Sequence, residues 1–484
     1  MKNWSDQYSL SEIVNLPLRL NPERFFPADS SVRAIAARLF SRIERLPIVS
    51  PHGHTDPAWF SRNLPFEDAV SLLLWPDHYL LRMLMSAGLT LESLGLAPAD
   101  RAECESNRRV IWRRFAEHYY LFRGTPSRLW LDHVFSTVFE IDVRLDASTA
   151  DRYFDTINAA LATPQFLPRA LFERFNMEVL ATTEAALDSL DAHRTIAASG
   201  WSGRVITTFR PDDVTDPERT DFVSNIQRLG EITHEDTGTW RGYLAALRSR
   251  RSFFREHGAT ATDHGHPTAF TANLALPGIE ALYARALASG LRGGDAELFR
   301  GQMLTEMARM SCDDGMVMQL HAGAWRNHNE TLYQRFGRDK GGDVPTQTDF
   351  TAALKPLLDL FGNRSDFTLI LFTLDESTYA RELAPLAGHY PCLRVGPAWW
   401  FYDAPDAMMR YRRSVTETAG FYNTVGFNDD TRAFFSIPAR HDLARRVDCS
   451  YLAELVAAHR LEEDEAAELA VDLAYRLPKR AYRL

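Results

Sequence analysis

Short β-rich runs alternate with longer helix-patterned segments along most of this 484-residue chain. Strands that alternate with helices form a parallel sheet. Eight units of this kind predict an α/β fold of the (β/α)8 TIM-barrel type. The eight runs are Pro47–Ser50, Val179–Thr183, Val205–Phe209, Ala259–Thr262, Met316–Leu320, Thr368–Leu374, Leu393–Gly396 and Thr424–Phe427.

An unadorned barrel of this type needs only about 250 residues, so much of the chain lies outside it. Most of the excess stands between the first two runs, where residues 60–175 are rich in aromatic residues and helix-patterned. We therefore predict one barrel over residues 1–484, with residues 60–175 as a large helical insertion after strand 1 that contributes to the mouth. A doubly wound open sheet is the alternative, but no GxGxxG motif follows a strand, so its nucleotide-binding form has little support.

Two histidines follow the first run, in the sequence Pro51-His52-Gly53-His54. Residues two apart on a strand point to the same face, and neutral imidazole is a common metal ligand. Alone, such a pair is more typical of a surface turn than of a metal site. The residues after the other runs change this balance.

Polar residues follow the other strands at the end where a barrel places its active site. Loop polarity would explain any one of them, but together they favour a metal-assisted enzyme. They are Thr182-Thr183-Glu184, Thr208-Phe209-Arg210-Pro211-Asp212, Asp263-His264-Gly265-His266, His321 with Arg326, Asp375-Glu376, Trp399-Trp400 and Asp429-Asp430-Thr431-Arg432.

A carboxylate after the last run completes a candidate metal site with His52 and His54. We choose Asp430 over Asp429 as this ligand. Such a site leaves positions open for substrate or water, and its ion would polarise a carbonyl or hydroxyl oxygen. The alternative for Asp430 is a helix N-cap, because a helical stretch follows it.

Two further groups of residues have the chemistry of a substrate site. A guanidinium binds a carboxylate through two hydrogen bonds, so arginines that converge on one mouth would suit an anionic substrate. These arginines are Arg210, Arg326 and Arg432. The second group is Asp77-His78-Tyr79 in the insertion, where a helix start capped by Asp77 is the alternative to a catalytic role.

Composition narrows the class of protein. The formal net charge of −10 argues against a nucleic-acid binder, although local arginines can still attract an anionic substrate. The four cysteines are far apart and form no CxxC motif, which is typical of reduced thiols in a cytosolic protein. The start Met1-Lys2-Asn3-Trp4-Ser5-Asp6 lacks a signal core, and no run approaches 18 apolar residues. We therefore expect a cytoplasmic protein with no membrane segment.

The chain resembles the uronate (glucuronate) isomerases, which belong to the amidohydrolase superfamily, and the resemblance covers nearly all of it. The motifs that carry it are Ser50-Pro51-His52-Gly53-His54, Asp77-His78-Tyr79, Thr208-Phe209-Arg210-Pro211-Asp212, Gln319-Leu320-His321 followed by Arg326-Asn327, Trp399-Trp400-Phe401 and Asp430-Thr431-Arg432.

The resemblance implies an enzyme that interconverts D-glucuronate with D-fructuronate, and D-galacturonate with D-tagaturonate. It also implies that His52, His54 and Asp430 surround a metal ion. His78, Tyr79, Arg210 and Arg432 would contact the sugar acid. To these we add Arg326, His321 and Trp399 as candidate substrate contacts. Related proteins suggest a homo-oligomer.

The chain departs from the two-metal hydrolases of the superfamily. Strand 4 ends without a bridging lysine, and strand 6 ends in Asp375 instead of a histidine. We therefore expect at most one divalent ion, zinc or manganese, and leave open whether His321 binds it.

The expected reaction is an aldose–ketose isomerisation through a cis-enediolate, with Asp430 as the base and Tyr79 or His78 as a proton shuttle between O1 and O2. A hydride shift between C1 and C2 is the rival chemistry. The functional alternatives are a mononuclear metal-dependent hydrolase (a deacetylase or deaminase) and a barrel that binds sugar acids without turnover.

Overall fold

The computed structural model describes residues 16–484, and its backbone divides into two compact units. The larger unit comprises Phe25–Asn63, Leu171–Arg326 and Asp343–Leu484, and it holds all the strands. The smaller unit comprises the described part of Met1–Arg24 together with Leu64–Ala170 and Asn327–Gly342. The segment Met1–Asp6, for which we expected no signal core, lies outside the described residues.

Seven parallel strands form the sheet of the larger unit, in the order β1-β2-β3-β4-β5-β8-β9. This order follows the chain without a reversal, as in a barrel, and it confirms the predicted α/β barrel class. The strands are β1 (Ile48–Ser50), β2 (Met177–Ala185), β3 (Arg204–Arg210), β4 (Ala261–His266), β5 (Val317–Ala322), β8 (Leu369–Thr373) and β9 (Leu393–Val395). The pair β6 (Ala324–Trp325) and β7 (Val344–Pro345) forms a separate two-stranded ladder.

The eighth predicted strand is reduced to one parallel bridge, between Val395 and Thr424. The chain beyond it still meets the first strand, because the His54 backbone N–H donates to the carbonyl of Thr431 at 3.0 Å. The seven strands are therefore curled into a half-barrel, and the segments after the first and last predicted strands meet at its carboxyl-terminal edge.

Four strands extend further than their apolar runs. β2 continues to Ala185, β3 to Arg210, β4 to His266 and β5 through His321. In the register of β4 and β5, Asp263 faces Gln319 and Gly265 faces His321. Polar residues predicted to follow these strands therefore lie within them, because their side chains find buried polar partners across the sheet.

Helices cover the outer face of the sheet. Alternate residues of β5, such as Met318 and Leu320, pack in the large apolar core with Tyr243 of α12 and Met307 of α14. The covering helices are α9 (Asp191–Ala198), α10 (Asp212–Thr215), α11 (Phe222–Thr233), α12 (Trp240–Glu256), α13 (Leu276–Ser289), α14 (Gly293–Asp314), α16 (Lys355–Phe361), α17 (Ala384–His389) and α18 (Pro405–Ala419).

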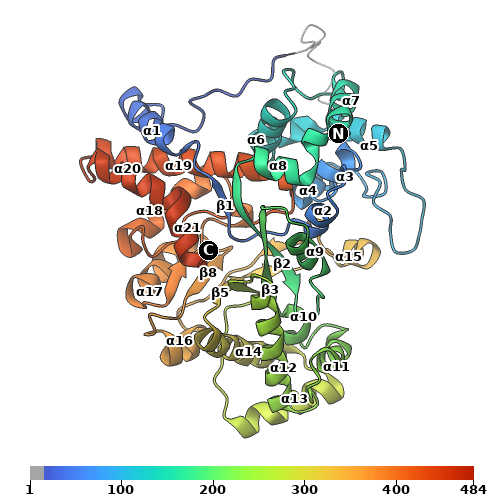
Figure 1. The fold of residues 1–484 in the computed structure, drawn as a ribbon, viewed down its shortest axis with the longest axis vertical. Coiled ribbons are helices and arrows are strands. Elements are labelled where there is room, and N and C mark those ends of the chain that lie inside the picture. Colours follow the sequence, from blue (N-terminus) through green and yellow to red (C-terminus); the bar gives the residue numbers. More distant parts are fainter. Residues whose placement is uncertain (1–15) are drawn as a thin grey trace, which may run out of the picture. The chain divides into compact units, whose positions relative to one another are not determined.

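The helix predicted before the first strand and the helical tail pack against each other. Figure 1 shows α1 (Ser30–Ile43) beside α19 (Ile437–Ala457) and α20 (Glu463–Val471). Asp29 caps α1 by accepting from the backbone N–H groups of Ser31 and Val32, and Leu39 and Ile43 bury the apolar stripe. This packing holds α19 in place, and residues of α19 contact the loop that carries Asp430. The remaining helices of this unit are α2 (Pro57–Arg62) and α21 (Leu477–Tyr482).

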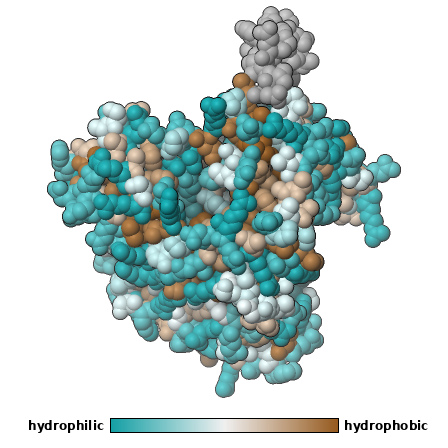
Figure 2. Space-filling view, turned by 45° about the horizontal axis from the view of Figure 1, so that its top comes forward, coloured by the Kyte–Doolittle hydropathy of each residue, from teal (hydrophilic) through white to brown (hydrophobic). Residues whose placement is uncertain are grey.

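Helices also dominate the smaller unit. They are α3 (Ala69–Leu73), α4 (His78–Ser86), α5 (Arg108–Glu117), α6 (Pro126–His133), α7 (Ala150–Leu161) and α15 (Glu330–Phe336), while α8 (Pro168–Arg174) stands in the chain where the two units join. The face shown in Figure 2 is largely hydrophilic, with hydrophobic residues in small groups. Across residues 16–484, we find no helix with the length and apolar character that crossing a membrane requires.

Candidate metal and active site

His52, His54 and Asp430 converge at the carboxyl-terminal edge of the sheet. Oδ1 of Asp430 lies 3.5 Å from Nε2 of His52 and 3.0 Å from Nε2 of His54. The two imidazole rings are 5.2 Å apart at an angle of 82°. The structure therefore brings together the two histidines and the carboxylate that the sequence analysis selected, with their ligand atoms within a few ångströms of one another.

The backbone of Asp430 has an uncommon conformation. Its φ is +37°, in the left-handed region that few residues other than glycine adopt. The alternative in which Asp430 caps a helix is wrong, because the following 3-10 turn (Phe434–Ser436) begins after Ala433 and α19 begins after Ser436. The neighbouring Asp429 points elsewhere, with Oδ2 accepting from Nε2 of His441 at 3.0 Å.

His321 joins this group from β5. Its Nδ1 lies 2.6 Å from Oδ1 of Asp263, and its Nε2 lies 3.9 Å from Oδ2 of Asp430. The ring also stacks on His52, with centroids 4.9 Å apart. A carboxylate at Nδ1 makes that nitrogen the N–H donor, so Nε2 carries the lone pair and faces Asp430.

Asp263 is a site residue that the sequence interpretation did not select. Besides His321, it contacts Arg210, whose Nη1 lies 3.0 Å from Oδ2 of Asp263. Burial opposes ionisation of Asp263, but the Arg210 guanidinium and the His321 ring outweigh it and hold the pKa of this carboxyl well below its ordinary value. The signal was present in the Asp263-His264-Gly265-His266 run, but a fully buried aspartate cannot be told from a loop aspartate by sequence alone.

His52 and His321 are buried, and ring nitrogens of both lack hydrogen-bond partners among the described residues. His52 is 1% exposed, and neither of its ring nitrogens has a hydrogen-bond partner among residues 16–484. The same holds for Nε2 of His321. Burial lowers the pKa of His52 to about 4, so this imidazole is neutral at pH 7.

These features fit a divalent cation. Unpartnered buried nitrogens are costly unless a ligand satisfies them, and neutral imidazoles beside an ionised carboxylate match the donor set of zinc. Burial opposes ionisation of Asp430, but the rings of His52 and His54 outweigh it and keep its pKa below the ordinary value. His52 also forms a compatible group with Asp263 and His321. The described residues can therefore hold a metal ion.

The arginine of β3 is held between two carboxylates. Its Nε donates to Oδ2 of Asp212 at 2.7 Å, on the side opposite the contact with Asp263. Gly265 makes room for this guanidinium, because a Cβ atom there would lie 2.0 Å from Nη2 of Arg210. A further group of ligand-type side chains, Asp212 with His264 and His266, lies beside it. Since Asp212 already pairs with Arg210, we assign that group no metal.

The remaining predicted residues of the larger unit lie at different distances from the metal group. Trp399 is buried, and its ring lies 4.7 Å from that of His321 in an edge-on arrangement. Arg326 is more exposed, pairs with Asp343 at 2.9 Å and lies over the ring of Trp400. Arg432 is half-buried in the loop that carries Asp430.

His78 and Tyr79 belong to the smaller unit. Asp77 caps α4 by accepting from the backbone N–H groups of Tyr79 and Leu80, which confirms the cap that was the alternative at this motif. The rings of His78 and Tyr79 stack with centroids 4.4 Å apart, and Tyr79 meets Trp130 edge-on. The cap fixes where the two side chains leave the helix, and their place over the barrel mouth stays a prediction.

Comparison with known proteins gives the family. A family model described as glucuronate isomerase matches residues 26–482. The uronate isomerase of Rhizorhabdus wittichii is 64% identical over 469 residues, which cover 97% of this chain and 99% of that protein.

Solved structures agree with the family model. The crystal structure of glucuronate isomerase from Caulobacter crescentus is 56% identical with a TM-score of 0.95, covering 97% of this chain and 98% of that one. The uronate isomerase of Thermotoga maritima is 25% identical with a TM-score of 0.89, covering 96% and 99%. With the barrel and its histidine–carboxylate group, these matches establish that the chain belongs to the glucuronate isomerase family.

Proposed function

We propose that this protein is an aldose–ketose isomerase that interconverts D-glucuronate with D-fructuronate, and D-galacturonate with D-tagaturonate. The observation that carries the proposal is the group formed by His52, His54, His321 and Asp430 at the carboxyl-terminal edge of the sheet, in a chain of this family. This edge is where barrels of this type place their chemistry.

Asp430 is the proposed base. Its carboxylate is ionised at neutral pH and lies beside the rings of His52 and His54, so it can accept the C2 proton of the open-chain sugar acid and return it to C1. Electrons from the C2–H bond form the C1–C2 double bond of the enediolate, and O1 takes up a proton while O2 loses one. Tyr79 or His78 would carry the proton between the two oxygens, which requires the 60–175 insertion to reach the mouth.

One divalent ion completes the proposed site, zinc by preference and manganese as the alternative. His52, His54 and Asp430 would hold it, and when bound it supplies positive charge that stabilises the enediolate oxygen. His321 presents its Nε2 to the same place and is a further substrate contact. Trp399 packs against the His321 ring and keeps that side of the site dry.

The substrate carboxylate needs a cation at the far end of the site. Arg210 is a candidate, but it already faces both Asp212 and Asp263, so these three side chains together carry a net negative charge. A substrate carboxylate therefore needs a second cation. We assign this role to Arg432, with Arg210 as the other arginine that binds the carboxylate. Arg326 is the weaker candidate, because it already pairs with Asp343 and is more exposed than Arg210.

We further propose that the protein works in the cytoplasm as a homo-oligomer, on a small-molecule hexuronate and without nucleic acid. Light scattering of the purified protein measures the oligomer directly, and a monomeric mass would overturn that part of the proposal.

Incubation of the purified protein with D-glucuronate tests the function. The expected result is a ketose product with unchanged total substrate mass. Release of acetate or ammonia from acylated or aminated analogues, with no ketose from glucuronate, would favour the hydrolase alternative. Binding of glucuronate without any product would favour the non-catalytic one.

A further inference from the structure

The loop that carries Asp430 is held in a strained conformation by contacts on two sides. A non-glycine residue at positive φ persists only where the surroundings over-determine it. On the barrel side, the loop is tied by the bond between the His54 N–H and the Thr431 carbonyl. The other side is the first turn of α19, and two consecutive residues of that helix contact the loop.

His441 is the first of these residues. Its Nε2–H donates to Oδ2 of Asp429 at 3.0 Å, and both side chains are buried. The imidazole is itself oriented by Phe427, whose ring meets it edge-on at 5.0 Å. Burial lowers the pKa of His441 below its ordinary value. Because the Asp429 carboxylate accepts, it selects the ring form that carries a proton on Nε2. Asp429 is thereby fixed directly before the strained residue.

Arg440 is the second. Its Nε donates to Oγ of Ser436 at 3.1 Å, and Nη1 contacts both the carboxylate of Asp403 and, at 3.5 Å, the backbone carbonyl of Asp429. Ser436 in turn lies 3.4 Å from Oγ1 of Thr431. The guanidinium therefore connects the loop on both sides of Asp430 with the segment after Trp399.

We propose that Arg440 and His441 are positioning residues for Asp430. They hold the residues on either side of it, so that its carboxylate stays within reach of His52 and His54. The contacts of Arg440 and His441 described above reach Asp429 directly and Thr431 through Ser436, so their effect on Asp430 passes through the residues on either side of it. This inference rests on the role of Asp430 proposed above. It adds two residues of α19 to the set that supports the site.

Four variants test it with the full-length protein. His441→Leu and Arg440→Met remove the contacts, whereas His441→Gln and Arg440→Lys retain a donor. Displacement of a catalytic group by about 1 Å can cost ~10²-fold in rate, so we expect the first two to lower kcat by at least ~10-fold. We expect the two conservative variants to recover part of that loss.

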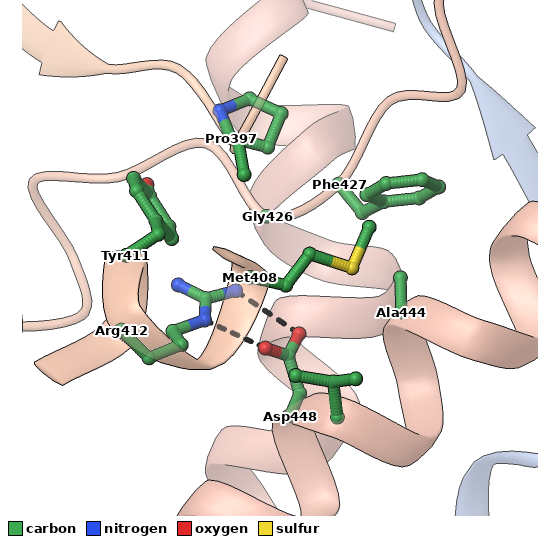
Figure 3. A pocket seen from close by; sticks show the side chains of 10 residues that line it. Pro397, Met408, Tyr411, Arg412, Gly426, Phe427, Ala444 and Asp448 are labelled. Atoms are coloured by element: carbon green, nitrogen blue, oxygen red, sulfur yellow. Dashed lines mark hydrogen bonds and ion pairs between the residues drawn. The ribbon is translucent and has the colours of Figure 1, made fainter. Parts of the chain in front are cut away.

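A matched control lies on the same helix. Asp448 of α19 accepts two hydrogen bonds from Arg412, at 2.6 and 3.0 Å, and Figure 3 shows this pair beside a small cavity. Asp448→Asn breaks a buried arginine–aspartate pair, as Arg440→Met does, but the broken contact does not involve residues 429–432. It should lower the melting temperature as much as the test variants do while kcat stays near the wild-type value.

Zinc affinity, measured by chelator competition, gives a readout independent of turnover. We expect His441→Leu and Arg440→Met to weaken zinc binding and Asp448→Asn to leave it unchanged. If the test variants lose kcat and zinc affinity no more than Asp448→Asn, the residues are merely structural and the proposal is overturned. Asp430→Asn is measured alongside: wild-type turnover in that variant would remove the role of Asp430 on which this proposal rests, whereas a wild-type protein that forms no ketose from D-glucuronate would defeat the proposed function itself. Should His441→Leu fail to fold, His441→Gln and the Arg440 pair decide.

Discussion

Replacing Gly265 by alanine should misplace the arginine of β3 without disturbing the fold. A Cβ atom at this position would lie 2.0 Å from Nη2 of Arg210 and 2.9 Å from Oδ2 of Asp212. Optimal contacts lie near ~3.5 Å, so the guanidinium must move by about 1.5 Å. Because the clash is with the end of a flexible side chain, the protein should still fold, and the substitution should lower activity more than stability.

The expected loss follows from that displacement. A shift of this size breaks the bond from Nε of Arg210 to Asp212, which is 2.7 Å long, and loosens the contact with Asp263. Misplacement of a positioning group by about 1 Å can cost ~10²-fold, which corresponds to ~2.7 kcal/mol in kcat/KM. The assay is steady-state conversion of D-glucuronate to ketose, with Gly278→Ala as a control because a Cβ there meets no atom within 4 Å.

A double variant distinguishes displacement of Arg210 from a general effect of the substitution on the backbone. In an Arg210→Met background the guanidinium is gone and only the milder contact with Asp212 remains, so adding Gly265→Ala should cost much less than it does in the wild type. Wild-type kcat/KM in Gly265→Ala, or an equal loss with and without Arg210, would refute the reasoning.

The other predictions concern the metal, the base, the anion anchor and a buried carboxyl. Asp430→Asn should lower kcat by ~10² or more, as loss of a general base does, while glucuronate binding remains measurable by calorimetry; near-normal turnover would transfer the role elsewhere. Replacing His52 and His54 together by alanine should lower the bound metal found by elemental analysis, and unchanged metal in the folded variant would exclude the site. Arg432→Met should lose ~2–5 kcal/mol of binding to glucuronate but little of any activity on glucose, and an equal loss on both sugars would contradict the anchor. Burial raises the pKa of Glu184 from 4.5 to about 7, so only the folded state keeps this proton between those values, and the free energy of unfolding falls by about 3 kcal/mol as the pH rises through that window. Glu184→Gln should lack this loss, which denaturant titrations at pH 4.5 and 8 measure; parallel curves for both proteins would show that Glu184 is not the cause.

Much of the fold could be predicted because its elements are local. An apolar run such as Val205–Phe209 carries its own strand signal, and its position in the alternation of strands and helices gives its place in the sheet. The last strand was harder, since only the bridge at Thr424 pairs with a neighbouring strand and the rest of that run is loop. Backbone pairing depends on partners far along the chain, which a local pattern does not contain.

The site was predictable where motif and topology agree. His52 and His54 stand two apart after a strand, and a barrel brings the end of the last strand to the same edge, so their meeting with Asp430 followed from the fold class. Asp263 was missed because its partners, His321 and Arg210, come from two other strands.

The contacts behind the loop were beyond sequence interpretation for the same reason. Arg440 and His441 read as ordinary polar residues of a long helix, and only the packing of α19 turns them towards residues 429–431. The positive φ of Asp430 likewise has no local sequence signal, because it arises from the contacts on both sides of the loop.

Isomerisation of D-glucuronate in deuterium oxide tests the central claim most directly. If Asp430 moves the C2 proton to C1, part of the D-fructuronate formed by the wild-type enzyme should carry solvent deuterium at C1, visible by NMR, and Asp430→Asn should form almost none of this product. Ketose formed by the wild type with no deuterium at C1 under any condition would point to a hydride shift. No ketose at all from glucuronate would contradict the account of the site as a uronate isomerase.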